Sequence, residues 1–201
     1  MRLLQVCTGR ARELPIGGRR VLTAIAKRAI AGPVAVRPMG LEGDEQADLG
    51  VHGGLAKAVY AYPHEHYAFW QTVRAQAAVA PWGEALPPGS LGENLTLEGL
   101  LEDSLWIGDR LHIGGGRPGS GCVLGVSEPR LPCFKFNASM GFMHAARLMI
   151  QSGWCGAYLT VLEPGHVQAG DAIELIPGPR EVNLRELFRA RAQAVVASSV
   201  G

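Results

Sequence analysis

Residues 104–126 read SLWIGDRLHIGGGRPGSGCVLGV, and this stretch decides the fold class. Ser104 to Ile113 contains two short strand-like halves, separated by a turn at Gly108-Asp109. Gly114 to Gly121 is dense in glycine and proline and predicts an exposed loop, after which Cys122 to Val126 predicts another strand. Short apolar runs broken by frequent turns favour a closed or barrel-like β architecture.

The same pattern continues in both directions along the chain. Further short apolar stretches predict strands at Leu3 to Thr8, Val21 to Ile30, Ala58 to Tyr62, Tyr158 to Leu162 and Ile173 to Ile176. Helices are predicted at Pro63 to Ala78, Ser139 to Gln151 and Asn183 to Ala197. We therefore expect a mainly β fold with flanking helices: a barrel domain over residues 1–178 and a short helical tail over 179–201, after Pro177-Gly178-Pro179.

The composition is that of a globular protein, with 47% hydrophobic and 18% charged residues among 201. The formal net charge of +1 gives no global electrostatic case for binding a nucleic acid polymer or an anionic membrane. No apolar run approaches the ~20 residues of a membrane span, and Met1 to Gly9 lacks the core of a signal peptide. We expect a cytoplasmic protein whose four scattered cysteines are free thiols without zinc-type spacing.

The segment Ser127 to Lys135, SEPRLPCFK, is the strongest candidate for a functional site. Its thiol, Cys133, is flanked by Arg130 and Lys135, and nearby cations stabilise the thiolate form that attacks or binds metal. Two prolines in the segment restrict the backbone around the thiol. A buried structural cysteine has no need of flanking cations, so we favour a functional role, although a lone cysteine can be inert.

Three other segments have both a chemical and a structural interpretation. The turn His52-Gly53-Gly54, followed by Lys57, is able to present backbone N–H groups to an anion, although a tight loop before a strand is the favoured interpretation. Lys27 lies on a predicted strand, where it faces either solvent or a phosphate. Glu93 and Asn94 either contact a heterocycle or satisfy their own hairpin turn, and the turn is favoured.

These segments occur in an order that resembles the MOSC family, named for the C-terminal domain of molybdenum cofactor sulfurases. The ordered motifs are Gly43-Asp44, His52-Gly53-Gly54 with Lys57-Ala58-Val59, Gly92-Glu93-Asn94-Leu95, Gly108-Asp109, and Pro129 to Lys135. The likeness extends over roughly residues 1 to 176, with Gly40 to Tyr67 as its most similar part, and points to the stand-alone bacterial YiiM-like branch. An ordered series is far more specific than any single motif.

The resemblance implies a barrel-like fold around a molybdenum-pterin cofactor, with Cys133 as the metal ligand and catalytic centre. It implies that Lys27, Arg130, the His52-Gly53-Gly54 turn and Lys57 or Lys135 bind the cofactor phosphate. Glu93 and Asn94 would hold the pterin edge or a substrate proton as catalytic residues. Relatives reduce N-hydroxylated compounds such as hydroxylaminopurines and amidoximes, a detoxification of modified bases. Their electrons come from a separate flavin-type reductase.

The chain departs from this family pattern in its short helical tail. If that tail forms the substrate entrance or a homodimer contact in the family, its shortening puts the substrate range in doubt, while the molybdenum site does not depend on it. Two alternatives to the enzyme remain open. One is a carrier of cofactor or of sulfur, in which Cys133 holds a persulfide without turnover. The other is a β-barrel interaction protein in which Cys133 is structural.

Overall fold

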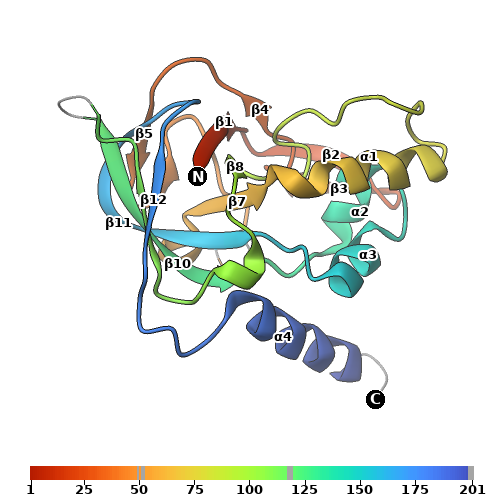
Figure 1. Ribbon diagram of the computed structural model, residues 1–201. Helices are drawn as coiled ribbons and strands as arrows, with labels where there is room; N and C mark the ends of the chain where they lie inside the picture. Colours follow the sequence, from red (N-terminus) through yellow and green to blue (C-terminus); the bar gives the residue numbers. More distant parts are fainter. Residues whose placement is uncertain (49, 51–52, 117–119, 199–201) are drawn as a thin grey trace.

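The computed structural model describes residues 1–48, 50, 53–116 and 120–198, which form a strongly curled β-sheet flanked by helices (Figure 1). Ten strands belong to the main sheet, and β2 and β3 form a separate hairpin. The strands are β1 Arg2–Thr8, β2 Arg12–Ile16, β3 Arg19–Thr23, β4 Arg28–Ala29, β5 Val34–Arg37, β6 Gly40–Leu41, β7 Val59–Pro63, β8 Leu95–Glu98, β9 Arg110–Ile113, β10 Gly121–Pro129, β11 Ala157–Val167 and β12 Ile173–Ile176.

The main sheet is open, so the predicted closed barrel is wrong, while the prediction of a mainly β fold with helices is confirmed. The strand order is β12-β9-β10-β11-β7-β8-β1-β4, with β5 and β6 attached to β11. Where a barrel would close, an isolated bridge joins Arg2 to Ala172, and backbone hydrogen bonds link Leu3 to Gly170 and Asp171 and Met1 to Ile173. Farther along β1, Cys7 and Thr8 pair with β4, so no complete ladder forms between β1 and β12.

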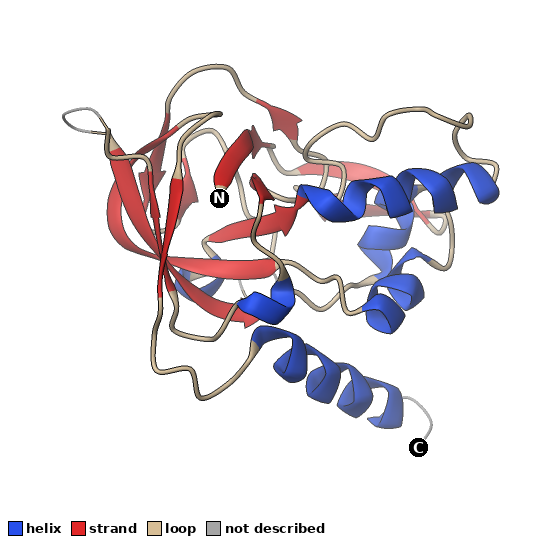
Figure 2. Ribbon diagram, in the orientation of Figure 1, coloured by secondary structure: helices blue, strands red, loops and turns tan. Residues whose placement is uncertain are grey.

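The helices gather beside one end of the sheet, and the last helix lies along its outside (Figure 2). The α-helices are α1 Tyr67–Gln76, α2 Phe134–Met140, α3 Ala145–Ser152 and α4 Leu184–Ser198; short 3-10 helices are η1 Leu55–Lys57, η2 His64–His66 and η3 Glu102–Ser104. Asn183 caps α4, because its side-chain oxygen accepts the N–H groups of Arg185 and Glu186 at 3.0 and 3.3 Å. None of the described helices is long and apolar enough to cross a membrane.

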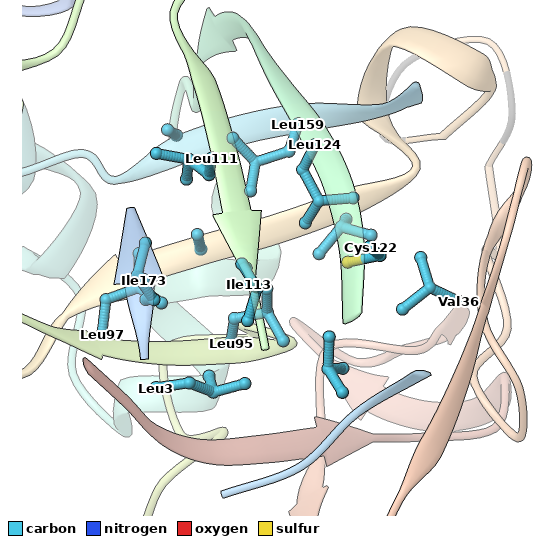
Figure 3. Packing of buried hydrophobic residues seen from close by; sticks show 14 of the residues in the cluster. Leu3, Val36, Leu95, Leu97, Leu111, Ile113, Cys122, Leu124, Leu159 and Ile173 are labelled. Carbon is cyan, nitrogen blue, oxygen red and sulfur yellow. The ribbon is translucent and has the colours of Figure 1, made fainter. Parts of the chain in front are cut away.

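Two hydrophobic cores hold these layers together. Inside the curled sheet, alternating side chains such as Leu3, Leu111 and Leu124 point toward one another, each with 0% exposure (Figure 3). The second core joins the helices to the sheet around Trp70, and includes Phe188 of α4. Because Phe188 of α4 is buried in this core, the C-terminal helix packs against the rest of the molecule. The predicted domain boundary between residues 178 and 179 stays a prediction.

Several predicted elements are shorter or more broken than the sequence suggested. The predicted strand Val21 to Ile30 is interrupted at residues 24–27, between β3 and β4. The predicted helix Ser139 to Gln151 is two helices, because Gly141 adopts a left-handed conformation (φ 84°) that ends α2. The helix predicted from Pro63 begins later, since Pro63 still pairs with Leu97 in the sheet.

Candidate functional site

An open cavity of about 630 Å³, part of it exposed to solvent, collects most of the predicted site residues. Its wall comes from six segments that are far apart in the sequence: residues 23–27, 44–48, 57–60, 92–94, 130–135 and Tyr158. Six residues singled out from the sequence line it: Lys27, Lys57, Asn94, Arg130, Cys133 and Lys135.

Cys133 lies on the cavity wall between the sheet and α2. Strand β10 ends at Pro129, which pairs with Ala157, and the chain then leaves the sheet before α2 begins. Cys133 has an extended backbone (φ −129°, ψ 178°) and is half-buried, whereas Cys7, Cys122 and Cys155 are buried. It is therefore the cysteine best placed to meet a ligand in the cavity.

Arg130 lies beneath the cavity with only 4% of its surface exposed. The centre of its guanidinium group is 5.0 Å from the ring of Tyr60 and 4.7 Å from the ring of Phe136, and its Nη1 is 3.8 Å from the Met149 sulfur. Aromatic rings attract a planar guanidinium through their π-electrons and hold it in one orientation. Arg130 is thus held by aromatic rings and a sulfur from outside its own segment.

The charge of Arg130 is not neutralised within the described part of the chain. Every ion pair found there involves other cations, and none joins a carboxylate to Arg130 or to the half-buried Lys135. Burial lowers the pKa of Arg130, but Tyr60, Tyr158 and Cys133 raise it by more, so the group stays charged. A buried cation without a carboxylate favours an anion as its partner.

Lys27 is in a different situation, because Asp44 already neutralises it. The Lys27 ammonium donates to Asp44 Oδ1 at 2.5 Å and to Oδ2 at 2.7 Å. Asp44 also accepts the N–H of Gly9 at 2.8 Å and the side-chain amide of Asn94 at 2.9 Å. Lys27 lines the cavity, but its main contact is this internal ion pair, and its role in binding a cofactor phosphate stays a prediction.

Asn94 and Glu93 both form extensive internal hydrogen bonds. Asn94 accepts the backbone N–H of Tyr60 at 3.0 Å and donates to the Cys7 carbonyl at 3.2 Å, so it joins β7 to β1. Glu93 has 0% exposure and is not among the lining residues, and its carboxylate accepts bonds from the Tyr67 hydroxyl and from the N–H of Gly89. These contacts make Glu93 an internal anchor, and its predicted contact with substrate or pterin stays a prediction.

The glycine turn before β7 is built around Gln46. The Gln46 side-chain oxygen accepts the N–H of Gly54 at 2.8 Å, and a Cβ on Gly53 would lie 2.5 Å from the same oxygen. Gly54 has φ 87°, a conformation that glycine adopts without strain. Neither glycine is among the lining residues, and His52 lies outside the described residues. The anion-binding role predicted for this turn is therefore untested.

Several residues of the cavity wall have no signal in the sequence that marks them as site residues, among them Asp44, Tyr60 and Tyr158. Asp44 was visible only as part of the Gly43-Asp44 motif, and its pairing with Lys27 across 17 residues has no local signal. The tyrosines resemble ordinary strand residues, because alternation along β7 and β11 does not reveal which face borders a cavity.

Comparisons with known proteins agree with this arrangement. The family model named MOSC domain matches residues 48–174. The chain is 35% identical to Protein YiiM of Escherichia coli (strain K12) over 186 residues, which are 91% of this chain and 75% of that protein. It is 35% identical over 193 residues to a protein of Gibberella moniliformis (strain M3125 / FGSC 7600) named Reductase, of which the match covers only 32%.

The fold of a solved relative supports the same assignment. The crystal structure of YiiM from Geobacillus stearothermophilus superposes with a TM-score of 0.71 at 27% sequence identity, covering 98% of this chain and 90% of that one. MOSC domains are associated with binding of the molybdenum cofactor, which supports a molybdenum-related function. The matched model, the sequence identity and the shared fold together show that the chain belongs to the MOSC domain family and is YiiM-like.

Proposed function

We propose that this protein binds a molybdenum-pterin cofactor in the cavity and reduces N-hydroxylated compounds, such as hydroxylaminopurines and amidoximes. The observation that carries the proposal is the shared position of the Cys133 thiol and the carboxylate-free guanidinium of Arg130 on one cavity wall. The name of the Gibberella moniliformis relative, Reductase, supports a reductive activity.

The cavity residues fit a cofactor of this class. Its phosphate needs cations, and Arg130 and Lys135 offer two that no described carboxylate neutralises. Its metal needs a soft ligand, and a half-buried thiol is suited to that role. In the described part of the chain, no cluster of three or more His, Cys, Asp or Glu is arranged to hold a bare metal ion. One protein thiolate, with the remaining ligands supplied by the cofactor, matches this donor set.

The chain's own residues have three tasks in this proposal. Cys133 donates its sulfur to the metal, while Arg130 and Lys135 bind the phosphate and orient the cofactor. The buried rings of Tyr60 and Tyr158 restrict water on one side of the cavity. When bound, the cofactor supplies the two-electron redox chemistry that cleavage of an N–O bond requires.

The overall reaction balances as a two-electron reduction. The substrate R–NHOH takes up two electrons and two protons and gives R–NH₂ and water. The electrons come from a separate flavin-type reductase, and the substrate is a small molecule that enters the cavity from solvent. A homodimer is the assembly state that we add to this proposal, and the mass of the protein in solution tests it.

The test compares molybdenum and pterin content in protein purified from a host that makes the cofactor. We expect both in the wild type, and a loss of molybdenum in Cys133→Ser. Cys122→Ala is the matched control, because it removes a thiol that does not line the cavity and keeps an apolar side chain in the sheet core. Equal molybdenum in wild type and Cys133→Ser would rule out the ligand role.

A second measurement separates the enzyme from a carrier. With a reduced viologen as electron donor, the wild type should convert a hydroxylaminopurine to the aminopurine, and Cys133→Ser should not. A persulfide on Cys133 in protein that retains no molybdenum and gives no turnover would instead identify a sulfur carrier.

A further inference from the structure

We propose that the arginine-rich hairpin of β2 and β3 is the docking surface for an acidic, flavin-carrying protein that donates electrons to the site in the cavity. The inference rests on the proposed function and deepens it, because it states where the electron donor binds and by what chemistry. The two strands contribute only Thr23 to the cavity wall, so their arginines have no part in holding the cofactor.

Positive charge is concentrated in one short part of the sequence, residues 10–28. This segment contains six of the 19 Lys and Arg residues but only one of the 18 Asp and Glu residues, Glu13, so its formal charge is +5. The rest of the chain therefore has a formal charge of −4, although the whole chain is close to neutral. The net charge of +1 conceals a basic segment within an otherwise acidic molecule.

Most of these cations lack an acidic partner within the described part of the chain. Lys27 is neutralised by Asp44, and Arg20 pairs with Glu13 at 2.6 Å. The other four arginines of the segment are exposed, and no ion pair among the described residues includes them: Arg10, Arg12, Arg19 and Arg28. Exposed guanidinium groups of this kind are suited to carboxylates on the surface of another protein.

The strand pairing spreads these arginines along the whole hairpin. β2 and β3 pair with each other in a two-stranded sheet that is separate from the main sheet (Figure 1). Arg19 and Arg20 follow the Gly17-Gly18 turn at one end, and Arg12 lies opposite Thr23 at the other. Five paired positions at ~3.4 Å each extend over about 17 Å. The positive surface is therefore compact, with the size of a small protein contact.

The outward face of the hairpin adds an apolar contact to this charge. Leu14 and Val21 share the face that is half-buried against the molecule. The opposite face consists of four exposed residues: Glu13, Pro15, Arg20 and Leu22. Leu22 is 51% exposed, and it lies between the arginines of the turn and those of the base. An apolar contact within a charged rim, with arginine enriched, is typical of protein–protein interfaces.

The base of the hairpin is part of the cavity wall. Thr23, the last residue of β3, is buried and lines the cavity together with Ala24 and Ile25. Arg12 is the cross-strand neighbour of Thr23. A protein that docks on the hairpin therefore lies next to the cavity that contains Cys133. From there it supplies the two electrons of the overall reaction and is itself oxidised by two electrons.

The charge distribution favours a compact acidic protein over an extended anion. A nucleic acid strand or a membrane surface reaches beyond the hairpin and meets the rest of the chain, whose formal charge is −4. Complexes between redox proteins bury small interfaces and are short-lived. Opposite charges at such an interface guide the encounter and raise the association rate by about 10- to 1,000-fold at low salt.

The test uses a flavodoxin, a small acidic protein that carries FMN, as the probe. We expect the ¹⁵N-labelled flavodoxin to bind the unlabelled protein at low ionic strength, as measured by an NMR titration. Near 1 M salt charges act over only about 3 Å, so the affinity should fall to that of a variant without the arginines. Because the readout is binding, it does not require molybdenum.

Charge-reversed double variants locate the contact. Arg12→Glu/Arg19→Glu should weaken flavodoxin binding about tenfold, and Arg12→Lys/Arg19→Lys should retain most of it. Arg110→Glu/Arg189→Glu is the matched control, because it makes the same change in net charge at exposed positions on β9 and α4, and it should weaken binding less than about twofold. Glu13→Gln removes the acidic residue of the hairpin and should strengthen binding about two- to threefold.

An equal loss in the two charge-reversed variants would overturn the inference, because it would show a response to net charge alone. Flavodoxin binding that does not depend on the hairpin would overturn it too. So would tighter hairpin-dependent binding to phosphatidylserine vesicles or to single-stranded DNA than to flavodoxin.

Turnover with reduced viologen separates this inference from the proposed function. A small donor needs no docking surface, so Arg12→Glu/Arg19→Glu should keep its viologen-driven rate and lose about tenfold of its flavodoxin-driven rate at low flavodoxin concentration. An equal loss of both rates would contradict a docking role. Wild-type protein without viologen-driven turnover would instead refute the proposed function, while flavodoxin binding would still report on the hairpin.

Discussion

Lys27 and Asp44 form a closed ion pair on the cavity wall, with ammonium-to-oxygen distances of 2.5 and 2.7 Å and side chains only 8% and 6% exposed. Lys27→Met should destabilise the fold by about 3–5 kcal/mol, because it leaves a buried carboxylate without its cation. Urea unfolding measures the change. Arg20→Ala is the control, because it breaks the exposed pair with Glu13 and should cost less than about 1 kcal/mol. Similar losses in both variants would contradict this account of Lys27.

The cavity wall at residues 24–27 is pressed against glycines of neighbouring turns. A Cβ on Gly89 would lie 2.8 Å from the carbonyl oxygen of Lys27, and Gly89 has φ +85°. Gly83 has a similar φ of +80° with no atom within 4 Å of its Cβ position. Gly83→Ala therefore measures the cost of backbone strain alone, without a steric clash. Gly89→Ala should therefore destabilise the protein by about 1–3 kcal/mol more than Gly83→Ala. Equal unfolding free energies for the two variants would show that residues 24–27 shift to accommodate the added Cβ without loss of stability.

The four cysteines should differ sharply in reactivity. Burial raises the pKa of Cys7 and of Cys122 to about 12, so both remain thiols at pH 8. Burial also raises the pKa of Cys155, whereas Cys133 is the half-buried thiol. Brief treatment with iodoacetamide at pH 8 should therefore modify Cys133 first, as read by peptide mass spectrometry. Protein unfolded in urea is the control and should react at all four, and early labelling of Cys122 in folded protein would contradict the prediction.

Glu93 should leave a signature in the pH dependence of stability. Burial raises its pKa above the ordinary value of 4.5, although bonds from Tyr67 and Gly89 oppose the shift. As the pH rises above 4.5, the unfolded chain releases this proton before the folded protein does, so the wild type loses stability. Glu93→Gln cannot titrate at this position. The unfolding free energy of the wild type should therefore fall relative to that of Glu93→Gln between pH 4.5 and 7, and a rising difference would show that the folded carboxyl has a lowered pKa.

The local part of the fold was predictable, and the long-range part was not. Short apolar runs identified the strands around Leu3 and Ile173, and the helix predicted over Asn183 to Ala197 agrees with α4 to within a residue at each end. The hairpin of β2 and β3 was missed, although Gly17-Gly18 between them is a typical two-residue turn. The open sheet was not predictable from the sequence. It arises because β1 pairs with β8 on one side and with β4 on the other, and these pairings join segments far apart in the chain.

The candidate site likewise has a part that could be predicted from neighbouring residues and a part that depends on contacts between distant segments. Arg130, Cys133 and Lys135 are neighbours in the sequence, so their shared place on the cavity wall could be predicted from one segment. The neutralisation of Lys27 by Asp44 and the burial of Glu93 depend on contacts between distant segments. Residue types alone indicated cations and carboxylates, but not which of them already pair with each other.

The order of the six wall segments along the chain has a consequence for the life of the protein. The last of them, Tyr158, lies in β11, and β11 is the strand that joins β10 to β7 in the middle of the sheet. The chain must therefore be synthesised as far as Tyr158, residue 158 of 201, before all six wall segments are present. The complete cavity is therefore a product of late synthesis, because it needs both β10 and β11 in the sheet.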